Sequence, residues 1–162
     1  PELGQLVNLQ KLLLDYNRLA SLPAELGQLA NLHELRLNDN ILTSIPAEFG
    51  KLVNLHTMQL NNNKLAAIPA ELGQLVKLQE LTLSNNKLTS LPAELGQLVN
   101  LKTVLLKDNP LTSLPAELEK MKGILHYVGH ITFENTSTQK IDAKEAFRQI
   151  AELMKKLESQ MA

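Results

Sequence analysis

The sequence predicts a solenoid in which short β-strands alternate with short helical segments, and three observations lead to this fold class. Leucine, asparagine and proline each recur at a spacing of 23 residues along most of the 162-residue chain. Within one unit, residues 78–100, an alternating segment around Leu81 and Leu83 precedes a second segment that begins at Pro92. A unit of this length cannot bury its apolar face alone, so stacked neighbours must supply the core.

A strand is expected in the first half of each unit. Leu81 and Leu83 keep a period of two, which places both on one face of the strand. The residues between and around them, Glu80, Thr82 and Ser84, then point to the opposite face. Each repeat therefore contributes one half-buried strand with a leucine face and a polar face.

An asparagine follows each predicted strand. Its amide can both donate and accept hydrogen bonds, so it can tie the backbone of its own turn to that of the next repeat. We interpret this column of polar residues as structural. Its members are Asn17, Asn40, Asn63, Asn86 and Asn109.

The second half of each unit begins with a proline, whose fixed φ suits the first position of a helix. In the unit that contains Pro92, the next residues place Glu94 near the positive end of a helical turn. Leu95 and Leu98 lie three residues apart on the inner side, and Gly96 relieves crowding where the chain turns back. A short helical or 3-10 segment is therefore expected after each strand.

These residues resemble a known family. The pattern "LQELTLSNNKL" matches the strand signature of leucine-rich repeats, and "LTSLPAELGQLVNL" is similar to their 23-residue intracellular and bacterial subtype. The resemblance implies an α/β fold, a curved right-handed solenoid with a parallel sheet on its concave side and short helical segments on its convex side. It covers residues 1–123, about five repeats, and it implies a module that binds another protein.

The repeat decays after residue 123, and residues 124–162 are expected to end the array. The stretch "ILHYVGHIT" aligns Tyr127 with Val104, which predicts a last degenerate strand. In the same alignment Thr132 stands at the corner that asparagine occupies in the other repeats.

Both ends of the array need a separate interpretation. A helix is expected at about residues 142–161, where Asp142 and Glu145 resemble a capping box. This helix is predicted to cap the leucine core, and a partner-binding or self-associating helix is the alternative. At the other end Pro1 falls in the column of Ala24, so no cap precedes the first strand. Either upstream repeats precede this end, or it contacts another chain, for example in self-association.

Composition argues against several classes of partner. Sixteen basic and seventeen acidic side chains give a formal net charge of −1, which does not favour nucleic acid or an anionic membrane. The chain has no cysteine and no apolar stretch of signal or membrane length. A cytoplasmic or intracellular location is therefore expected, and a secreted effector whose signal lies outside this sequence is the alternative.

Motifs for catalysis are missing from the sequence, which predicts a protein that is not an enzyme and needs no cofactor. Two pairs of histidines are the candidates for a metal site. His33 and His56 share a column and should lie about 5 Å apart on adjacent strands, and His126 and His130 are four residues apart. Zinc would need further ligands beside such a pair, so no metal site is predicted and a metal-dependent enzyme is the weakest alternative.

The strand positions between the leucines differ from repeat to repeat, so they must provide any specificity. Near one end Leu13, Tyr16 and Arg36 supply the apolar, aromatic and arginine side chains that are typical of protein interfaces. A non-catalytic module that binds a protein partner on the concave sheet is therefore predicted. The predicted contact residues are Leu13, Asp15, Tyr16, His33, Glu34, Arg36, Asn38, Thr57, Gln59, Asn61, Glu80, Thr82, Ser84, Leu105 and Lys107.

Such a module is expected to be part of a larger bacterial or intracellular signalling or effector protein. The near-identical "PAELGQL" blocks leave a second hypothesis, a structural or engineered repeat scaffold without an evolved ligand. The irregular segment after residue 123 favours a natural gene.

Overall fold

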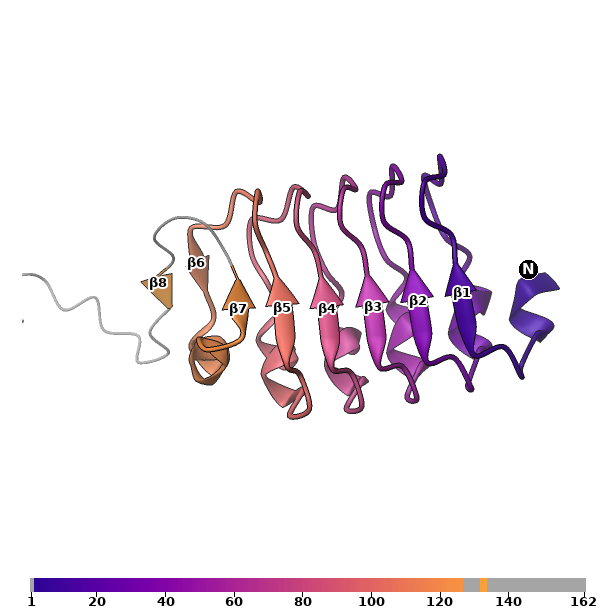
Figure 1. The fold of residues 1–162 in the computed structure, drawn as a ribbon. Helices are drawn as coiled ribbons and strands as arrows, with labels where there is room; N and C mark the ends of the chain where they lie inside the picture. Colours follow the sequence, from indigo (N-terminus) through magenta and orange to yellow (C-terminus); the bar gives the residue numbers. More distant parts are fainter. Residues whose placement is uncertain (1, 127–131, 134–162) are drawn as a thin grey trace, which may run out of the picture.

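The computed structural model describes residues 2–126, 132 and 133, and these residues form a right-handed solenoid that advances by one strand per repeat (Figure 1). Six strands form a parallel sheet along one side, in the order β1-β2-β3-β4-β5-β7. Their bounds are β1 (Lys11–Leu13), β2 (Glu34–Arg36), β3 (Thr57–Gln59), β4 (Glu80–Thr82), β5 (Thr103–Leu105) and β7 (Leu125–His126). The concave sheet expected from the sequence is confirmed.

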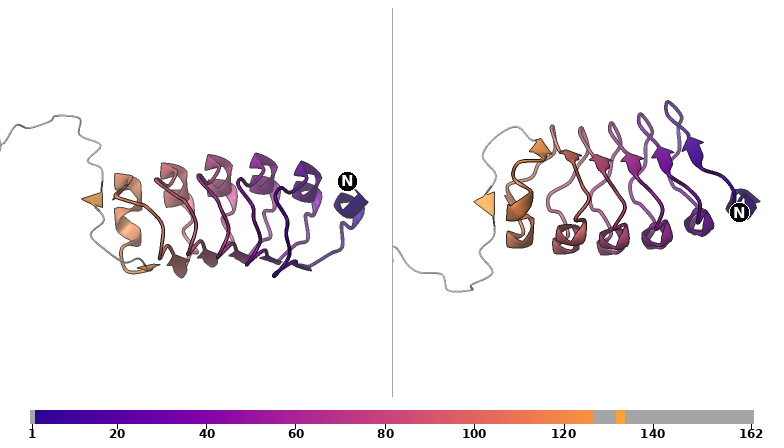
Figure 2. Two further views of the ribbon diagram at one scale, coloured as in Figure 1. Left: turned by 90° about the horizontal axis from the view of Figure 1, so that it is seen from above. Right: turned by 60° about the horizontal axis from the view of Figure 1, so that its bottom comes forward.

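A row of 3-10 helices forms the second layer, behind the sheet (Figures 1 and 2). Their bounds are η1 (Glu2–Gln5), η2 (Ala24–Gln28), η3 (Ala47–Lys51), η4 (Ala70–Gln74), η5 (Ala93–Gln97) and η6 (Ala116–Met121). Each of η2 to η6 follows a proline, as in η3, where Pro46 has an extended backbone with φ of −59° and ψ of 137°. The hydrogen bonds that define the short turn then follow, such as Phe49 N–H to the Pro46 carbonyl at 3.1 Å.

Residues 23 positions apart lie side by side in the sheet. Leu12 is paired with Leu35, and Leu35 is paired with Met58, with the same offset. This register continues through β5, where Leu81 is paired with Val104. A column of the sequence alignment is therefore a row of neighbouring side chains in space, one residue per strand.

Glycine allows the 3-10 helices to pack backbone against backbone. A Cβ atom on Gly50 would lie 2.5 Å from the carbonyl oxygen of Glu71 in the next helix. The equivalent distances are 2.4 Å at Gly27 and 2.9 Å at Gly96. Real Cβ atoms do not approach an oxygen so closely, so the glycine column relieves crowding, as the sequence predicts.

The leucine columns form one continuous core between the two layers. In the middle repeats these side chains are sealed from solvent, and Leu55, Leu60 and Leu78 each have an exposed fraction of 0%. Phe49 and Met58 fill positions of the same columns and are equally buried. Burial of this apolar surface is the main force that holds neighbouring repeats together.

The asparagine column ties each repeat to the one before it. Asn63 Nδ2 donates to the carbonyl oxygens of Leu60 at 3.1 Å, in its own turn, and of Leu37 at 2.9 Å, in the preceding repeat. Its Oδ1 atom accepts the N–H of Leu42 at 3.1 Å. Asn40 and Asn86 make the equivalent contacts, so in the middle repeats these asparagines link neighbouring turns.

The last strand of the sheet lies two residues earlier than the sequence alignment predicts, so that alignment is wrong. Leu125, not the residue at 127, pairs with Val104. Helix η6 ends at Met121, whose side chain is buried. The chain then enters the sheet two residues earlier than in the other repeats.

Thr132 does not take the asparagine corner. It belongs to β8 (Thr132–Phe133), which pairs in parallel with β6 (Ser113–Leu114) in a second sheet of two strands. In the structure Thr132 therefore corresponds to Ser113, four residues after the corner at Asn109, because the final repeat is shorter than the others. The helix expected at 142–161 lies outside the described residues, as does His130.

Candidate protein-binding surface

The register of the sheet brings five of the predicted contact residues into one row across its middle, which we call the central row. It runs over the strands β1 to β5 at equivalent positions. The members of the central row are Leu13, Arg36, Gln59, Thr82 and Leu105. The row therefore has leucine at both ends and polar side chains between them.

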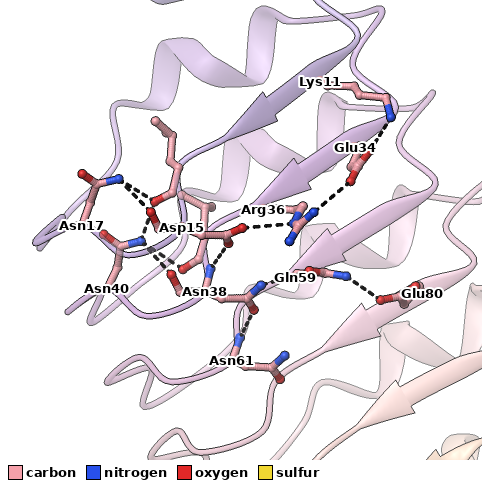
Figure 3. Close-up of polar contacts among 12 residues, drawn as sticks. Lys11, Asp15, Asn17, Glu34, Arg36, Asn38, Asn40, Gln59, Asn61 and Glu80 are labelled. Atoms are coloured by element: carbon pink, nitrogen blue, oxygen red, sulfur yellow. Dashed lines mark hydrogen bonds and ion pairs between the residues drawn. The ribbon is translucent and has the colours of Figure 1, made fainter.

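Arg36 is held in place by acidic neighbours on both sides (Figure 3). Its Nε atom lies 3.0 Å from Asp15 Oδ2, and its guanidinium group also approaches Glu34 at 3.9 Å. Glu34 in turn forms an ion pair with Lys11 at 2.8 Å. The Arg36 side chain remains 41% exposed, so it is ordered but still available to a partner.

Amide side chains continue this polar network toward β4 (Figure 3). Asn38 Nδ2 donates to Gln59 Oε1 at 2.9 Å, and Gln59 Nε2 donates to Glu80 Oε1 at 2.8 Å. The middle of the concave face is therefore a set of side chains that already satisfy one another. Such groups confer less affinity than unpaired ones, because a partner must replace existing bonds.

Three predicted contact residues have a structural role that the sequence did not reveal. Asp15 Oδ1 accepts the backbone N–H of Asn38 at 2.8 Å, and Asn38 Oδ1 accepts that of Asn61 at 2.9 Å. Asn61 Oδ1 then accepts the N–H of Ser84 at 2.9 Å. These side chains form a second ladder beside the asparagine column, so they help to fix the stacking of the repeats.

Thr82 was expected among the contact residues, but it is only 3% exposed. Its short side chain lies between two longer neighbours of the central row, Gln59 and Leu105. A partner on the concave face would meet those neighbours first, so Thr82 is not an accessible contact residue in this structure.

The other predicted contact residues divide by their exposure. Those that are exposed are Leu13, Tyr16, His33 and Lys107. Those that are half-buried are Asp15, Glu34, Arg36, Asn38, Thr57, Gln59, Asn61, Glu80, Ser84 and Leu105. The most accessible apolar and aromatic groups of this set therefore lie at the β1 end of the sheet.

Tyr16 is the most unusual of these residues. It is 81% exposed, and its φ of 57° places it in the left-handed region. The equivalent residues of the next repeats have the same backbone conformation, but they are Asp39, Asn62, Asn85 and Asp108. Asparagine and aspartate tolerate this region, whereas a bulky aromatic residue there is strained. The turn of the repeat sets this conformation, and the Tyr16 N–H donates to the Asn38 carbonyl at 3.0 Å as the Asp39 N–H does to that of Asn61.

The Tyr16→Asn variant is expected to raise the free energy of unfolding by about 0.5–1 kcal/mol, because asparagine relieves the strain. Chemical denaturation at 25 °C measures this change. The reverse exchange, Asn62→Tyr, is the matched control and should lower stability, since it introduces the strain and removes the bonds of Asn62 to Asp39 and Asn85. If the Tyr16→Asn variant were less stable, Tyr16 would have a structural role instead.

The two histidines of one column stack as their spacing predicts. The ring centroids of His33 and His56 are 5.2 Å apart and the planes differ by 11°. His33 Nδ1 lies 2.6 Å from the Asn31 carbonyl oxygen. Among the described residues no group of three or more His, Cys, Asp or Glu side chains is close enough to hold a metal ion.

Sequence reasoning missed a second apolar feature, at the loops that lead into the strands. Val53, Val76 and Val99 are 47%, 48% and 78% exposed, and Leu6 and Val7 of the first repeat are about half exposed. The sequence contained a signal for this exposure. The buried leucines of each helical segment lie three residues apart, as Leu95 and Leu98 do, and each valine is the residue directly after the second of them. In the part of the chain that the structure describes, no helix has the length and apolar character needed to cross a membrane.

Comparison with solved structures finds this fold in proteins of different origins. A leucine-rich repeat protein of Leptospira interrogans is 43% identical, with a TM-score of 0.74 over 83% of this chain. The leucine-rich repeat ectodomain of the plant receptor kinase GASSHO1/SCHENGEN3 from Arabidopsis thaliana is 36% identical, with a TM-score of 0.70 over 81% of this chain. That ectodomain is in complex with CASPARIAN STRIP INTEGRITY FACTOR 2.

A plant peptide hormone receptor, RGFR1, in complex with RGF2, is 29% identical, with a TM-score of 0.65 over 80% of this chain. The chain spans 34% of the Leptospira protein, 17% of the GASSHO1/SCHENGEN3 ectodomain and 22% of RGFR1. A search of curated proteins finds no match.

The family model described as "Leucine rich repeat" matches this sequence twice, over residues 7–65 and 53–111. The matched region contains the strands β1 to β5 and the helices η2 to η5. Solenoids of this kind commonly act as protein-binding modules and typically carry no catalytic site. The chain therefore belongs to the leucine-rich repeat family.

Proposed function

We propose that this chain binds a protein or peptide partner on its concave sheet, without catalysis. The observation that carries the proposal is Tyr16, an exposed aromatic residue in a strained backbone position where the other repeats have aspartate or asparagine. The turn of the repeat imposes this conformation, as it does on the equivalent residues of the other repeats, and residues held in sparsely populated conformations cluster at functional sites. Leu13, 54% exposed, and the ordered Arg36 lie on the same end of the sheet.

Among the predicted contact residues, the exposed ones are proposed to supply most of the binding energy. Tyrosine and arginine are enriched among residues whose truncation weakens protein interfaces most. Leu13 and Tyr16 provide exposed apolar surface at one end of the sheet, while Lys107 provides an exposed basic group beside the half-buried Leu105 at the other. The half-buried side chains between them would define shape and polarity rather than affinity.

We also propose that the chain acts within a larger bacterial or intracellular signalling or effector protein. The similarity to a Leptospira protein of which it covers 34% supports this context. The peptide and protein complexes of the plant receptors support a polypeptide ligand rather than a small molecule. A repeat scaffold without an evolved ligand is the competing hypothesis.

Affinity capture from a cell lysate, followed by calorimetric titration of the captured protein, tests the proposal. The native chain is compared with a concave variant that carries Tyr16→Ala, Leu105→Asp and Lys107→Glu. Loss of the exposed Tyr16 and Lys107 side chains and of the half-buried Leu105 side chain should weaken binding by at least tenfold, which corresponds to about 1.4 kcal/mol.

A convex variant provides the matched control, because Val99→Asp and Lys120→Glu also replace one exposed apolar and one basic side chain. It should bind as the native chain does. A partner held equally by the native chain and the concave variant would place the binding site elsewhere. The scaffold hypothesis would gain if neither the native chain nor any variant captured a protein.

A further inference from the structure

Two histidines lie side by side where the chain enters the strands β2 and β3. His33 directly precedes β2, and His56 directly precedes β3. Their backbones are joined, because the N–H groups of His56 and Thr57 both donate to the His33 carbonyl, at 2.9 and 3.1 Å. The register of the parallel sheet therefore holds the two side chains on the same face, one strand apart.

The imidazole rings of this pair are stacked, with centroids 5.2 Å apart and planes that differ by 11°. In the same column of the repeat, the neighbours of the pair are the neutral amides Gln10 and Gln79. Two lysines of this region are turned toward amide oxygens. Lys102 Nζ donates to Gln79 Oε1 at 3.0 Å, and Lys77 Nζ donates to Asn54 Oδ1 at 2.7 Å.

Both rings turn the same nitrogen toward the protein. His33 Nδ1 lies 2.6 Å from the Asn31 carbonyl oxygen. Because a carbonyl can only accept, Nδ1 of the neutral ring carries the proton and Nε2 has the free lone pair. His56 Nδ1 is buried without a hydrogen-bond partner among the residues that the structure describes. Nε2 is therefore the nitrogen that remains for a ligand in both rings, and the stacking makes the two Nε2 atoms point the same way.

We propose that His33 and His56 bind one Cu²⁺ ion through their Nε2 atoms. Imidazole nitrogen suits Cu²⁺, which has the highest affinity of the divalent first-row metals for a given nitrogen site. In the tetragonal geometry of this ion, two imidazoles can occupy adjacent positions while water fills the others. A bond from the second ring nitrogen to a backbone carbonyl, as in His33, commonly orients a metal-binding histidine and raises its basicity.

The pair needs a small movement to chelate the ion. With metal–nitrogen bonds of about 2.0 Å, as for zinc, adjacent ligand atoms lie about 3 Å apart. The stacked rings must therefore tilt toward each other by about 1 Å each at Nε2, which side-chain rotations of about 20° within one rotamer well supply.

Zinc fits the pair less well than copper. A structural zinc site takes four protein ligands, and a catalytic site takes three. Within the described part of the chain no group of three or more His, Cys, Asp or Glu side chains could hold a metal ion. A pair of imidazoles completed by water is therefore expected to prefer Cu²⁺ to Zn²⁺.

Calorimetric titration of the 162-residue chain with copper(II) chloride tests the site, and one Cu²⁺ ion should bind per histidine pair. Electron spin echo modulation counts the imidazoles on the ion and should report two. His33→Gln and His56→Gln should each raise the dissociation constant at least tenfold and leave one imidazole. Glutamine is the matched replacement, because it is the native residue of this column in the adjacent repeats.

A relocated pair separates metal binding from a change in structure. The His33 N–H donates to the Gln10 carbonyl at 2.7 Å, as the His56 N–H does to that of His33. Adding Gln10→His to His56→Gln therefore creates an equivalent pair one strand away. This double variant should recover part of the affinity and the signal of two imidazoles. If it bound Cu²⁺ no better than His56→Gln alone, the proposal would be contradicted.

The other two histidines, His126 and His130, provide the control. A variant that replaces both with glutamine should keep the affinity of the native chain for Cu²⁺. Loss of the ion in this control would overturn the proposal. So would native affinity in His33→Gln and His56→Gln, or a single imidazole on the ion in the native chain.

The Cu²⁺ site does not depend on the proposed function. The concave variant, with changes at Tyr16, Leu105 and Lys107, keeps both ligands and should bind Cu²⁺ as the native chain does. A chain that binds Cu²⁺ through the pair but captures no protein supports the metal site alone. A chain that captures a partner and shows no histidine-dependent Cu²⁺ binding supports the proposed function alone.

Discussion

The Gly50→Ala variant is expected to lose about 3 kcal/mol of unfolding free energy, as overpacking of a tight contact does. The new Cβ would lie 2.5 Å from the Glu71 carbonyl oxygen and 2.9 Å from the Glu71 Cβ atom. Neither neighbour is the flexible end of a side chain, so the two helices must move apart. The usual gain of about 0.4–1 kcal/mol from a less flexible unfolded chain does not offset this cost. Equilibrium denaturation in urea measures the difference.

Other glycines of the chain serve as controls for this expectation. Gly96 faces the same carbonyl column at 2.9 Å, so Gly96→Ala should cost less than Gly50→Ala. A Cβ on Gly123 would meet nothing within 4 Å, so Gly123→Ala should change stability by less than about 0.5 kcal/mol. If all three variants were equally destabilised, the cause would be backbone conformation rather than contact between helices.

The Asn63→Ala variant is expected to cost a similar amount, about 3 kcal/mol, because several buried backbone groups lose a partner. Asn63 is 8% exposed and accepts the N–H of Leu42. Its amide also donates to the buried carbonyls of Leu37 and Leu60, which would each keep one bond, from Asn40 and from Asn86. Thermal and urea denaturation would both report the loss.

Asn17 provides the matched control, because it occupies the same column in the first repeat but is exposed. It donates only to the carbonyls of Leu14 and Asp15, so Asn17→Ala should cost less than about 1 kcal/mol. Asn63→Asp separates the two roles of the amide, since aspartate can accept the Leu42 N–H but cannot donate. If Asn63→Asp retained full stability, the donated bonds would not matter.

The repeated part of the fold could be predicted because it is overdetermined. The leucine, asparagine, proline and glycine columns each specify the same 23-residue register, and a wrong alignment would violate all of them. The last repeat lacks this redundancy. There the alignment rested on Ile124 and its neighbours, and it failed because the repeat is shortened before β7 by two residues.

Individual side chains of the candidate surface were harder to predict than the surface itself. A period of two placed Thr82 on the concave face, but only the lengths of its neighbours Gln59 and Leu105 explain why it is buried. Likewise, Asp15 and Asn38 look like free polar residues in the sequence. Their bonds to backbone groups of the following repeat depend on loop geometry, which one sequence does not specify.

The asparagine bonds also bear on how the chain reaches this fold. A parallel sheet usually folds slowly, because distant segments must meet before any contact stabilises them. Here Asn63 bonds to residues no more than 26 positions away, and the paired strands are offset by 23 or fewer residues. Each repeat can therefore form against its finished neighbour after closing one short loop. The folding rate should depend on this single step, so additional repeats would lengthen the solenoid without making its first contacts harder to form.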